Sequence, residues 1–152
     1  MSRRDQIRMS DAEVEEYLHG RHTMNVASYN HDGTIHLVAM WYGFLDGVPA
    51  FWTYGKSQKI LNLRRDPRIT CLVETGDTYD QLKGVELVGR GTVLEDRTEI
   101  ERIGEDVYGR YFGEFNDAAA EGVKATGAKR LGVRIDVEKA VSWDHTKLGG
   151  TY

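Results

Sequence analysis

A short basic segment is the part of the sequence best equipped to bind an anion. Residues 55–68, GKSQKILNLRRDPR, hold five basic side chains and one acidic side chain, which gives a formal charge of +4. The whole chain carries −4, so the other residues sum to −8. A glycine and a serine precede a predicted helix start, where backbone N–H groups and ammonium groups can converge. The segment is predicted to bind phosphate, and the alternative is a solvated basic helix face.

Aromatic and apolar side chains are concentrated just before this segment. They are Met40, Trp41, Tyr42, Phe51, Trp52 and Tyr54. Strands of this kind can form a flat wall for a planar ring, and the alternative is an ordinary barrel core. A ring wall that leads into a phosphate pocket favours a nucleotide-like cofactor. The sequence has no G-x-G-x-x-G and no P-loop, which argues against a Rossmann-type site.

Hydrophobic periodicity predicts the elements that must position these residues. We predict strands over residues 22–28, 34–44, 48–54, 69–73, 85–95 and 130–143, helices over 11–19, 56–65, 97–112 and 116–124, and a tail over 145–152. The first three strands are predicted to form an antiparallel meander. About six mainly antiparallel strands with flanking helices indicate an α+β barrel over residues 1–152, in one domain.

The composition excludes several classes of protein. With 152 residues and 40% hydrophobic residues, the chain can build a core of its own. A net charge of −4 and a pI near 5.7 argue against nucleic acid and anionic lipid as partners. Cys71 is the single cysteine, expected to be a small buried hydrophobe in a reducing compartment. No apolar stretch resembles a signal peptide or a membrane span, so a cytoplasmic protein is expected.

The basic segment and the strands before it carry a family resemblance. The chain reads DG-x-x-H-x-x-x-MWY, then DG, then F-x-T-x-x-x-S-x-K-x-x-NL-x-x-DPR up to Arg68. This resembles the pyridoxamine 5′-phosphate oxidase-like superfamily of split β-barrels that bind FMN. More narrowly, it is similar to the flavin and deazaflavin (coenzyme F-420) oxidoreductases of that superfamily. The similarity includes the later V-E-L-V-G-R-G-x-V strand and Trp143.

The resemblance implies a homodimer with two cofactor sites at the interface between the subunits. Ser57 and Lys59 would bind the cofactor phosphate, with Lys56 and Gln58 beside it. The other implied site residues are Val38, Ala39, Met40, Trp41 and Thr53 along the ring, Asn62 in the motif, and Trp143 and the strand around residues 85–87 from the partner subunit. Arg64 and Arg65 extend the basic patch, which favours the long acidic tail of coenzyme F-420 over FMN.

Several questions stay open at the level of the sequence. The oxidase that names the superfamily has an arginine where this chain has Gln58, and a different motif in place of residues 144–147, so pyridoxamine phosphate oxidation is doubtful. Tyr42, Tyr79 and His145 are candidate proton donors, but no catalytic residue is assigned. His36 is interpreted as a surface histidine, and no metal site is expected. A barrel that binds flavin, deazaflavin or haem without turnover is the non-catalytic alternative.

Overall fold

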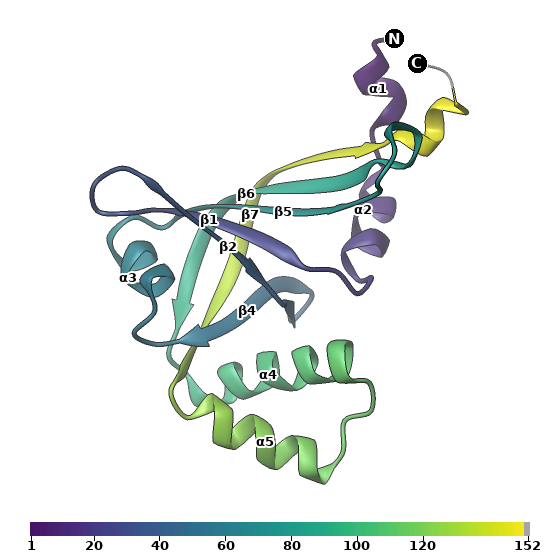
Figure 1. Ribbon diagram of the computed structural model, residues 1–152. Helices are drawn as coiled ribbons and strands as arrows, with labels where there is room; N and C mark the ends of the chain where they lie inside the picture. The colour runs from purple at the N-terminus through teal and green to yellow at the C-terminus, as the bar shows by residue number, and fades with distance from the viewer. Residues whose placement is uncertain (151–152) are drawn as a thin grey trace.

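A computed structural model describes residues 1–150, which form an antiparallel sheet that curls into a half-barrel with flanking helices (Figure 1). The strands are β1 (Met24–Tyr29), β2 (Ile35–Met40), β3 (Gly43–Leu45), β4 (Val48–Tyr54), β5 (Arg68–Thr75), β6 (Lys83–Leu94) and β7 (Arg130–Asp144). The helices are α1 (Arg3–Ile7), α2 (Asp11–Leu18), α3 (Gln58–Arg65), α4 (Arg97–Phe112) and α5 (Asp117–Gly127), and η1 (Tyr79–Gln81) and η2 (His145–Leu148) are single 3-10 turns. The predicted α+β split barrel is confirmed.

The strands are arranged in the order β2-β1-β5-β6-β7-β4-β3. The sheet is open between β2 and β3, although these strands follow each other in the chain. The long strands β6 and β7 run the length of the molecule, from α5 to the end where α1 and η2 lie (Figure 1). Their register shifts between Val88 and Gly89, as at a β-bulge, which sharpens the twist of the sheet.

The two antiparallel pairings of the predicted meander are confirmed, since β1 pairs with β2 and β3 pairs with β4, but the continuous strand over residues 34–44 is wrong. The chain leaves β2 after Met40 and begins β3 at Gly43, so β4 pairs with β3 and β7 and not with β2. The cause is Tyr42, which is fully buried. Its hydroxyl donates to the carbonyl of Leu18 at 2.5 Å, and its N–H donates to the hydroxyl of Tyr111 at 3.3 Å. These tertiary bonds replace the strand pairing that a continuous strand would need.

The helices follow their sequence signals closely, with small differences at the ends. The helix predicted over residues 97–112 is α4, and Asp96 caps it by accepting from the N–H of Glu99. The prediction missed α1, and α5 extends three residues beyond the expected end. Of the predicted tail, residues 145–148 form η2 and residues 151–152 lie outside the described part.

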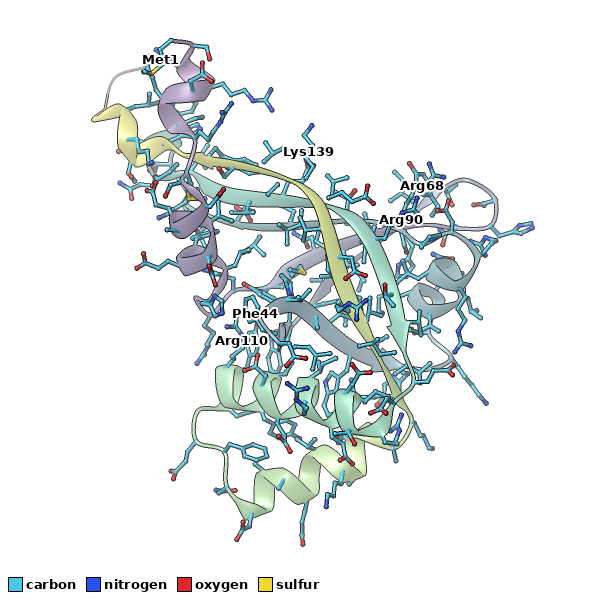
Figure 2. The ribbon with its side chains drawn as sticks, turned by 180° about the vertical axis from the view of Figure 1, so that it is seen from behind. Met1, Phe44, Arg68, Arg90, Arg110 and Lys139 are labelled. Carbon is cyan, nitrogen blue, oxygen red and sulfur yellow. The ribbon has the colours of Figure 1, made fainter. Side chains whose placement is uncertain are left out.

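Hydrophobic side chains form two buried clusters on opposite sides of β4. Phe51 belongs to the cluster inside the half-barrel, together with Cys71, where burial raises the pKa of the thiol to about 12. This confirms Cys71 as a buried hydrophobe. Trp52 belongs to the second cluster, which α4 and α5 cover. In the last turn of α4, Arg110 lies against Phe44 (Figure 2).

The second cluster leads to a first prediction, on two glycines of α4. A Cβ at Gly104 would lie 2.4 Å from the Trp52 ring, whereas a Cβ at Gly109 would meet nothing within 4 Å. Gly104→Ala should therefore lower the free energy of unfolding, because overpacking costs about 1–3 kcal/mol. Gly109→Ala should raise it by about 0.5–1 kcal/mol, the usual gain in a helix interior. Urea unfolding of both variants measures these changes. Equal changes in the free energy of unfolding would show that the Trp52 ring does not restrict the side chain at position 104.

Candidate functional site

The end of β4 and the start of α3 form a polar cradle, here defined as Thr53, Ser57, Lys59 and the first N–H groups of α3. The N–H of Ser57 donates to the carbonyl of Tyr54 at 2.9 Å, which closes the connecting turn. The hydroxyl of Thr53 lies 3.4 Å from that of Ser57. Ser57 occupies the N-cap position, but its side chain makes no capping hydrogen bond to the helix. The hydroxyl of Ser57 can therefore donate to a ligand, while the buried Thr53 hydroxyl supports it from below.

Lys59 gives the cradle a positive charge without a counter-ion. Its side chain is nearly buried, with 9% of the residue surface exposed, and burial lowers the pKa of its ammonium group. Within the described residues, no carboxylate lies within ion-pair distance of this ammonium group. The first N–H groups of a helix lack intrahelical acceptors, and the helix dipole adds positive potential there. An anion would compensate all of these groups at once.

Asn62 holds α3 in place against β1. Its side-chain amide donates to Ser28 Oγ at 3.1 Å and to Asn30 Oδ1 at 3.0 Å, and its oxygen accepts from Gln58 at 2.8 Å. Arg65 also donates to that oxygen, at 3.1 Å. Asn62 is fully buried and its hydrogen-bonding groups are engaged within the chain. It is a positioning residue for the cradle, and it ties Gln58 to the same network.

His36 lies on the face of the sheet that α3 covers, which corrects its interpretation as a surface histidine. It pairs across the strands with Ser28, and paired residues share a face. Ser28 in turn accepts from Asn62 of α3. Nδ1 of His36 is buried and has no hydrogen-bond partner among the described residues. Buried ring nitrogens are normally bonded, so this atom is a candidate ligand contact.

The residues predicted to line a ring alternate between two faces of β2. Val38 and Met40 pack against the inner cluster, whereas Ala39 is exposed on the other face and Trp41, just after β2, is exposed and stacked on Tyr111 of α4. A bound ring could therefore contact the side chains of Val38 and Met40 or those of Ala39 and Trp41, but not all four. Ala39, Met40 and Trp41 also border a cavity of about 420 Å³ beside α4 and α5.

The candidate proton donors do not gather at the cradle. Tyr42 is buried in the core, where burial raises the pKa of its hydroxyl above the usual value. Tyr79 and His145 contact each other, with Nδ1 of the histidine 2.7 Å from the carbonyl of the tyrosine. Both lie in the 3-10 turns at the far end of β6 and β7. None of the three predicted proton donors therefore lies at the cradle.

Trp143 lies far from the cradle within one chain. It pairs with Gly84 near the start of β6, whereas Leu63 of α3 packs against Gly91 of the same strand. Seven residues of strand span on the order of 20 Å. Figure 1 shows this end of β7 and α3 on opposite sides of the molecule. One chain alone therefore does not bring Trp143 to the predicted phosphate site.

The outer part of the basic patch is mostly paired. Arg64 forms an ion pair with Glu95, and Arg68 pairs with Asp66 at 2.6 Å. Arg65 donates to the carbonyl of Tyr29 at 2.8 Å and to Asn62. Lys56 is exposed, and no ion pair links it to the described residues. Arg64 is the arginine that can turn to a ligand without disturbing the fold, since its ion pair is exposed.

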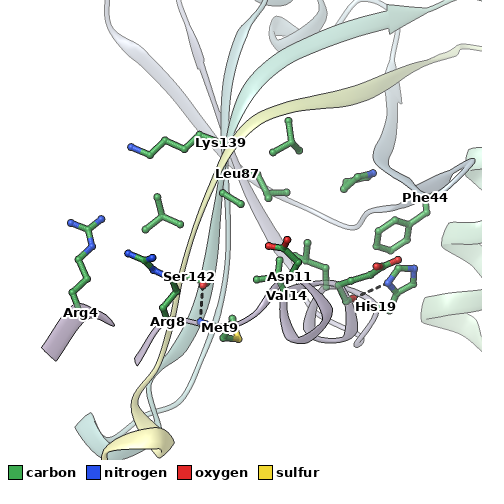
Figure 3. A pocket seen from close by; sticks show the side chains of 17 residues that line it. Arg4, Arg8, Met9, Asp11, Val14, His19, Phe44, Leu87, Lys139 and Ser142 are labelled. Atoms are coloured by element: carbon green, nitrogen blue, oxygen red, sulfur yellow. Dashed lines mark hydrogen bonds between the residues drawn. The ribbon is translucent and has the colours of Figure 1, made fainter. Parts of the chain in front are cut away.

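A separate groove of about 560 Å³ runs between the N-terminal helices and β7 (Figure 3). Arg4, Arg8 and Lys139 lie at one end, and His19 and Phe44 lie at the other. The N–H of Met9 donates to Ser142 Oγ at 3.0 Å and fixes the chain along this groove. Leu87, on the strand expected from the partner subunit, lines this groove, but neither the cradle residues nor Val38–Trp41 do. We therefore place the candidate site at the cradle.

Comparisons with known proteins give the family and the fold. A family model of pyridoxamine 5′-phosphate oxidase matches residues 10–144. A conserved hypothetical protein of Mycobacterium tuberculosis is 41% identical in sequence, with a TM-score of 0.94 over 100% of this chain and 95% of that one. A comparison with curated proteins finds no match.

Two more distant structures share the fold. An F-420 reductase is 21% identical, with a TM-score of 0.66 over 83% of this chain and 94% of that one. A haem-binding protein from Mycobacterium smegmatis is 14% identical, with a TM-score of 0.62 over 93% of this chain and 60% of that one. Proteins with this fold therefore include an F-420 reductase and a haem binder.

Proposed function

Because the chain belongs to the pyridoxamine 5′-phosphate oxidase family, we propose that it is an oxidoreductase that uses coenzyme F-420. It transfers a hydride to or from a small organic substrate, and FMN is the alternative cofactor within the same class. The observation that carries the proposal is Lys59, a nearly buried lysine at the start of α3 that has no counter-ion among the described residues. A cytoplasmic location stays a prediction.

The cradle fits the phosphate that both cofactors carry. Lys59 supplies a charge, Thr53 and Ser57 supply hydroxyls, and α3 supplies backbone N–H groups. Nδ1 of His36, which has no hydrogen-bond partner within residues 1–150, lies on the same side of the sheet. When bound, the cofactor supplies the hydride chemistry, and the chain holds its phosphate and excludes water from its ring. Asn62 keeps α3 at the position this requires.

A second subunit is part of the proposal. The exposed face of β2 carries apolar side chains, and Trp143 stands far from the cradle of its own chain. In a homodimer with shared sites, Trp143 and Glu86 of the partner subunit complete the site around Val38–Trp41. Val85 and Leu87, also expected there, are buried in the core of their own chain. The exposed apolar face of β2 supports a dimer, because large exposed apolar patches are uncommon on monomeric proteins.

The reaction that names the family is not proposed for this chain. Gln58 is bonded to Asn62 at 2.8 Å and carries no charge for a phosphate. At the C-terminal motif, the carboxylate of Asp144 caps η2 by accepting from the N–H of Thr146 at 3.0 Å, and it lies 3.5 Å from the ammonium group of Lys83. These residues serve the fold, which supports a substrate other than pyridoxamine phosphate.

Coenzyme F-420 is preferred over FMN because of the charges beyond the cradle. FMN ends at its phosphate, whereas in the deazaflavin the phosphate is a diester that continues into a tail with several carboxylates. Lys56, which has no ion pair with the described residues, can bind these carboxylates. Arg64 can leave its ion pair with Glu95 to bind them, because an exposed ion pair contributes only about 0–1 kcal/mol.

This preference predicts a graded effect of charge removal. Replacing Lys56 and Arg64 together with alanine should lower the affinity for coenzyme F-420 several-fold and leave FMN affinity nearly unchanged. The loss should shrink at high salt, because exposed charges are screened. Titrations at low and high salt measure it. An equal loss for both cofactors would place these side chains at the shared phosphate instead, and no loss would make FMN the better choice.

The experiment that tests the proposal compares the two cofactors side by side. Calorimetric titration with oxidised and reduced coenzyme F-420 and with FMN should show tighter binding of the deazaflavin. Tighter binding of FMN would overturn the choice of cofactor, and binding of neither would overturn the proposal. Haem is included in the titration series. Cofactor binding without reoxidation of the reduced form by any electron acceptor would favour the non-catalytic alternative.

A further inference from the structure

We propose that the cavity between β2, β4 and the α4–α5 hairpin is a subsite for an aromatic carboxylate. The cavity has a volume of about 420 Å³, within the range of small-molecule sites. As a substrate subsite it rests on the proposed function, because it borders the strand that would line the cofactor ring. Its ability to bind such a ligand does not depend on the cofactor and can be tested alone.

Aromatic rings form the walls of this cavity. Trp41, Trp52, Tyr108 and Phe112 all line it. The Trp41 ring is stacked on Tyr111 with centroids 4.7 Å apart and meets Phe112 edge-on at 5.4 Å. Trp41 is nevertheless 46% exposed, so its surface is open to a ligand. Such walls favour a flat aromatic guest.

Arg130 gives the cavity its charge. It is the single charged side chain among the described residues that line it. Its guanidinium carbon lies 4.9 Å from the Trp52 ring centroid and 4.6 Å from that of Tyr54. Nε donates to the carbonyl of Thr126 at 3.2 Å, which fixes the plane of the group.

The two terminal nitrogens of Arg130 are left for a ligand. Among the described residues, neither makes a hydrogen bond, and no carboxylate pairs with the guanidinium group. A guanidinium group binds a carboxylate through two parallel hydrogen bonds, and an aromatic stack below it holds it ready. The geometry thus combines an oxyanion contact with ring walls in one cavity.

The cavity also lies next to the proposed cofactor site. Ala39 and Met40 belong to both the predicted ring wall and the cavity lining. Tyr54, which stacks under Arg130, directly follows Thr53 of the cradle. A ligand bound to Arg130 would therefore lie between the strand that lines the predicted ring and the cradle. The α4–α5 hairpin, which carries Tyr108 and Thr126, forms the wall of the cavity opposite the sheet.

A pair of isosteric probes tests the subsite. Calorimetric titration of the cofactor-free protein with 2-naphthoate and with neutral 2-naphthamide separates the contribution of the charge from that of the rings. The wild-type protein should bind the acid at least tenfold more tightly than the amide. Equal affinities, or no binding of the acid at millimolar concentration, would overturn the proposal.

Variants then assign the contacts. Arg130→Gln should abolish the preference for the acid and leave the affinity for the amide unchanged, whereas Lys129→Gln, on the neighbouring residue, should change neither. Trp41→Ala should weaken both probes. Circular dichroism of each variant confirms folding, and the comparison of probes on the wild-type protein decides the matter if Arg130→Gln unfolds. A preference that survives in folded Arg130→Gln would contradict the assignment.

Addition of cofactor separates this proposal from the proposed function. With saturating coenzyme F-420, 2-naphthoate should still bind, with less than a threefold change in affinity. Mutual displacement would show that the cofactor itself fills the cavity and would overturn the subsite as a substrate site. If no cofactor binds but the acid is still preferred, the subsite stands and the proposed function fails.

Discussion

Replacing Lys59 with alanine is expected to weaken cofactor binding by about 1.5–3 kcal/mol, which is roughly a ten- to hundredfold loss of affinity. The reason is that Lys59 is the charged member of the cradle and has no counter-ion in the described chain. The loss should be the same for coenzyme F-420 and FMN, because both present a phosphate there. Calorimetric titration of each cofactor measures it. Folding stability should change little, since no ion pair is broken.

The surrounding chain offers a matched control and a pH test. Lys129→Ala removes an exposed lysine and should alter neither affinity nor stability.

Burial lowers the pKa of Lys59 in the free protein, and a bound phosphate would raise it again. Affinity should therefore fall as pH rises through the pKa of the free protein toward that of the complex, with proton uptake on binding. Lys59→Ala should lack this dependence. Unchanged affinity in Lys59→Ala would refute the phosphate assignment.

The second large effect concerns the exposed face of β2. Ile35 and Leu37 are 64% and 67% exposed, and they share a face with Ala39 along the edge strand. Burying such a side chain contributes about 1.5–3 kcal/mol, and a symmetric dimer buries each one twice. Replacing both with aspartate should therefore convert a dimer into a monomer of 17.2 kDa. Because the sites are proposed to be shared, cofactor affinity should fall as well.

Light scattering at micromolar concentration measures the mass of this variant and of the wild-type protein. Leu61→Asp is the control, since Leu61 is 52% exposed but lies on α3 rather than on the sheet face. Its mass should equal that of the wild-type protein. A wild-type mass near 17 kDa would contradict both the dimer and the shared site.

The local parts of the structure were predictable because their signals are local. The cap at Asp96 and the apolar face of α4 set that helix without help from distant residues. The cradle also lies within one short stretch, from Thr53 to Lys59, so spacing alone brings its members together. Buried Cys71 needed only its apolar neighbours.

Long-range partners were not predictable. The break after Met40 depends on Tyr42 bonding to Leu18 and Tyr111, which lie far away in the chain. The true position of His36 follows from its register with Ser28 and from the helix that packs there. Arg130 carries no motif, and it meets the aromatic cavity because β7 pairs with β4, a pairing that no local pattern encodes.

The most direct test of the account is a crystal structure of the protein with coenzyme F-420 bound. The phosphate of the coenzyme is expected within hydrogen-bond distance of Ser57 and Lys59, at the start of α3. The ring should lie along Val38–Trp41 with Trp143 of the partner subunit nearby. A phosphate bound instead among Arg4, Arg8 and Lys139, in the groove beside α1 and α2, would contradict the central claim.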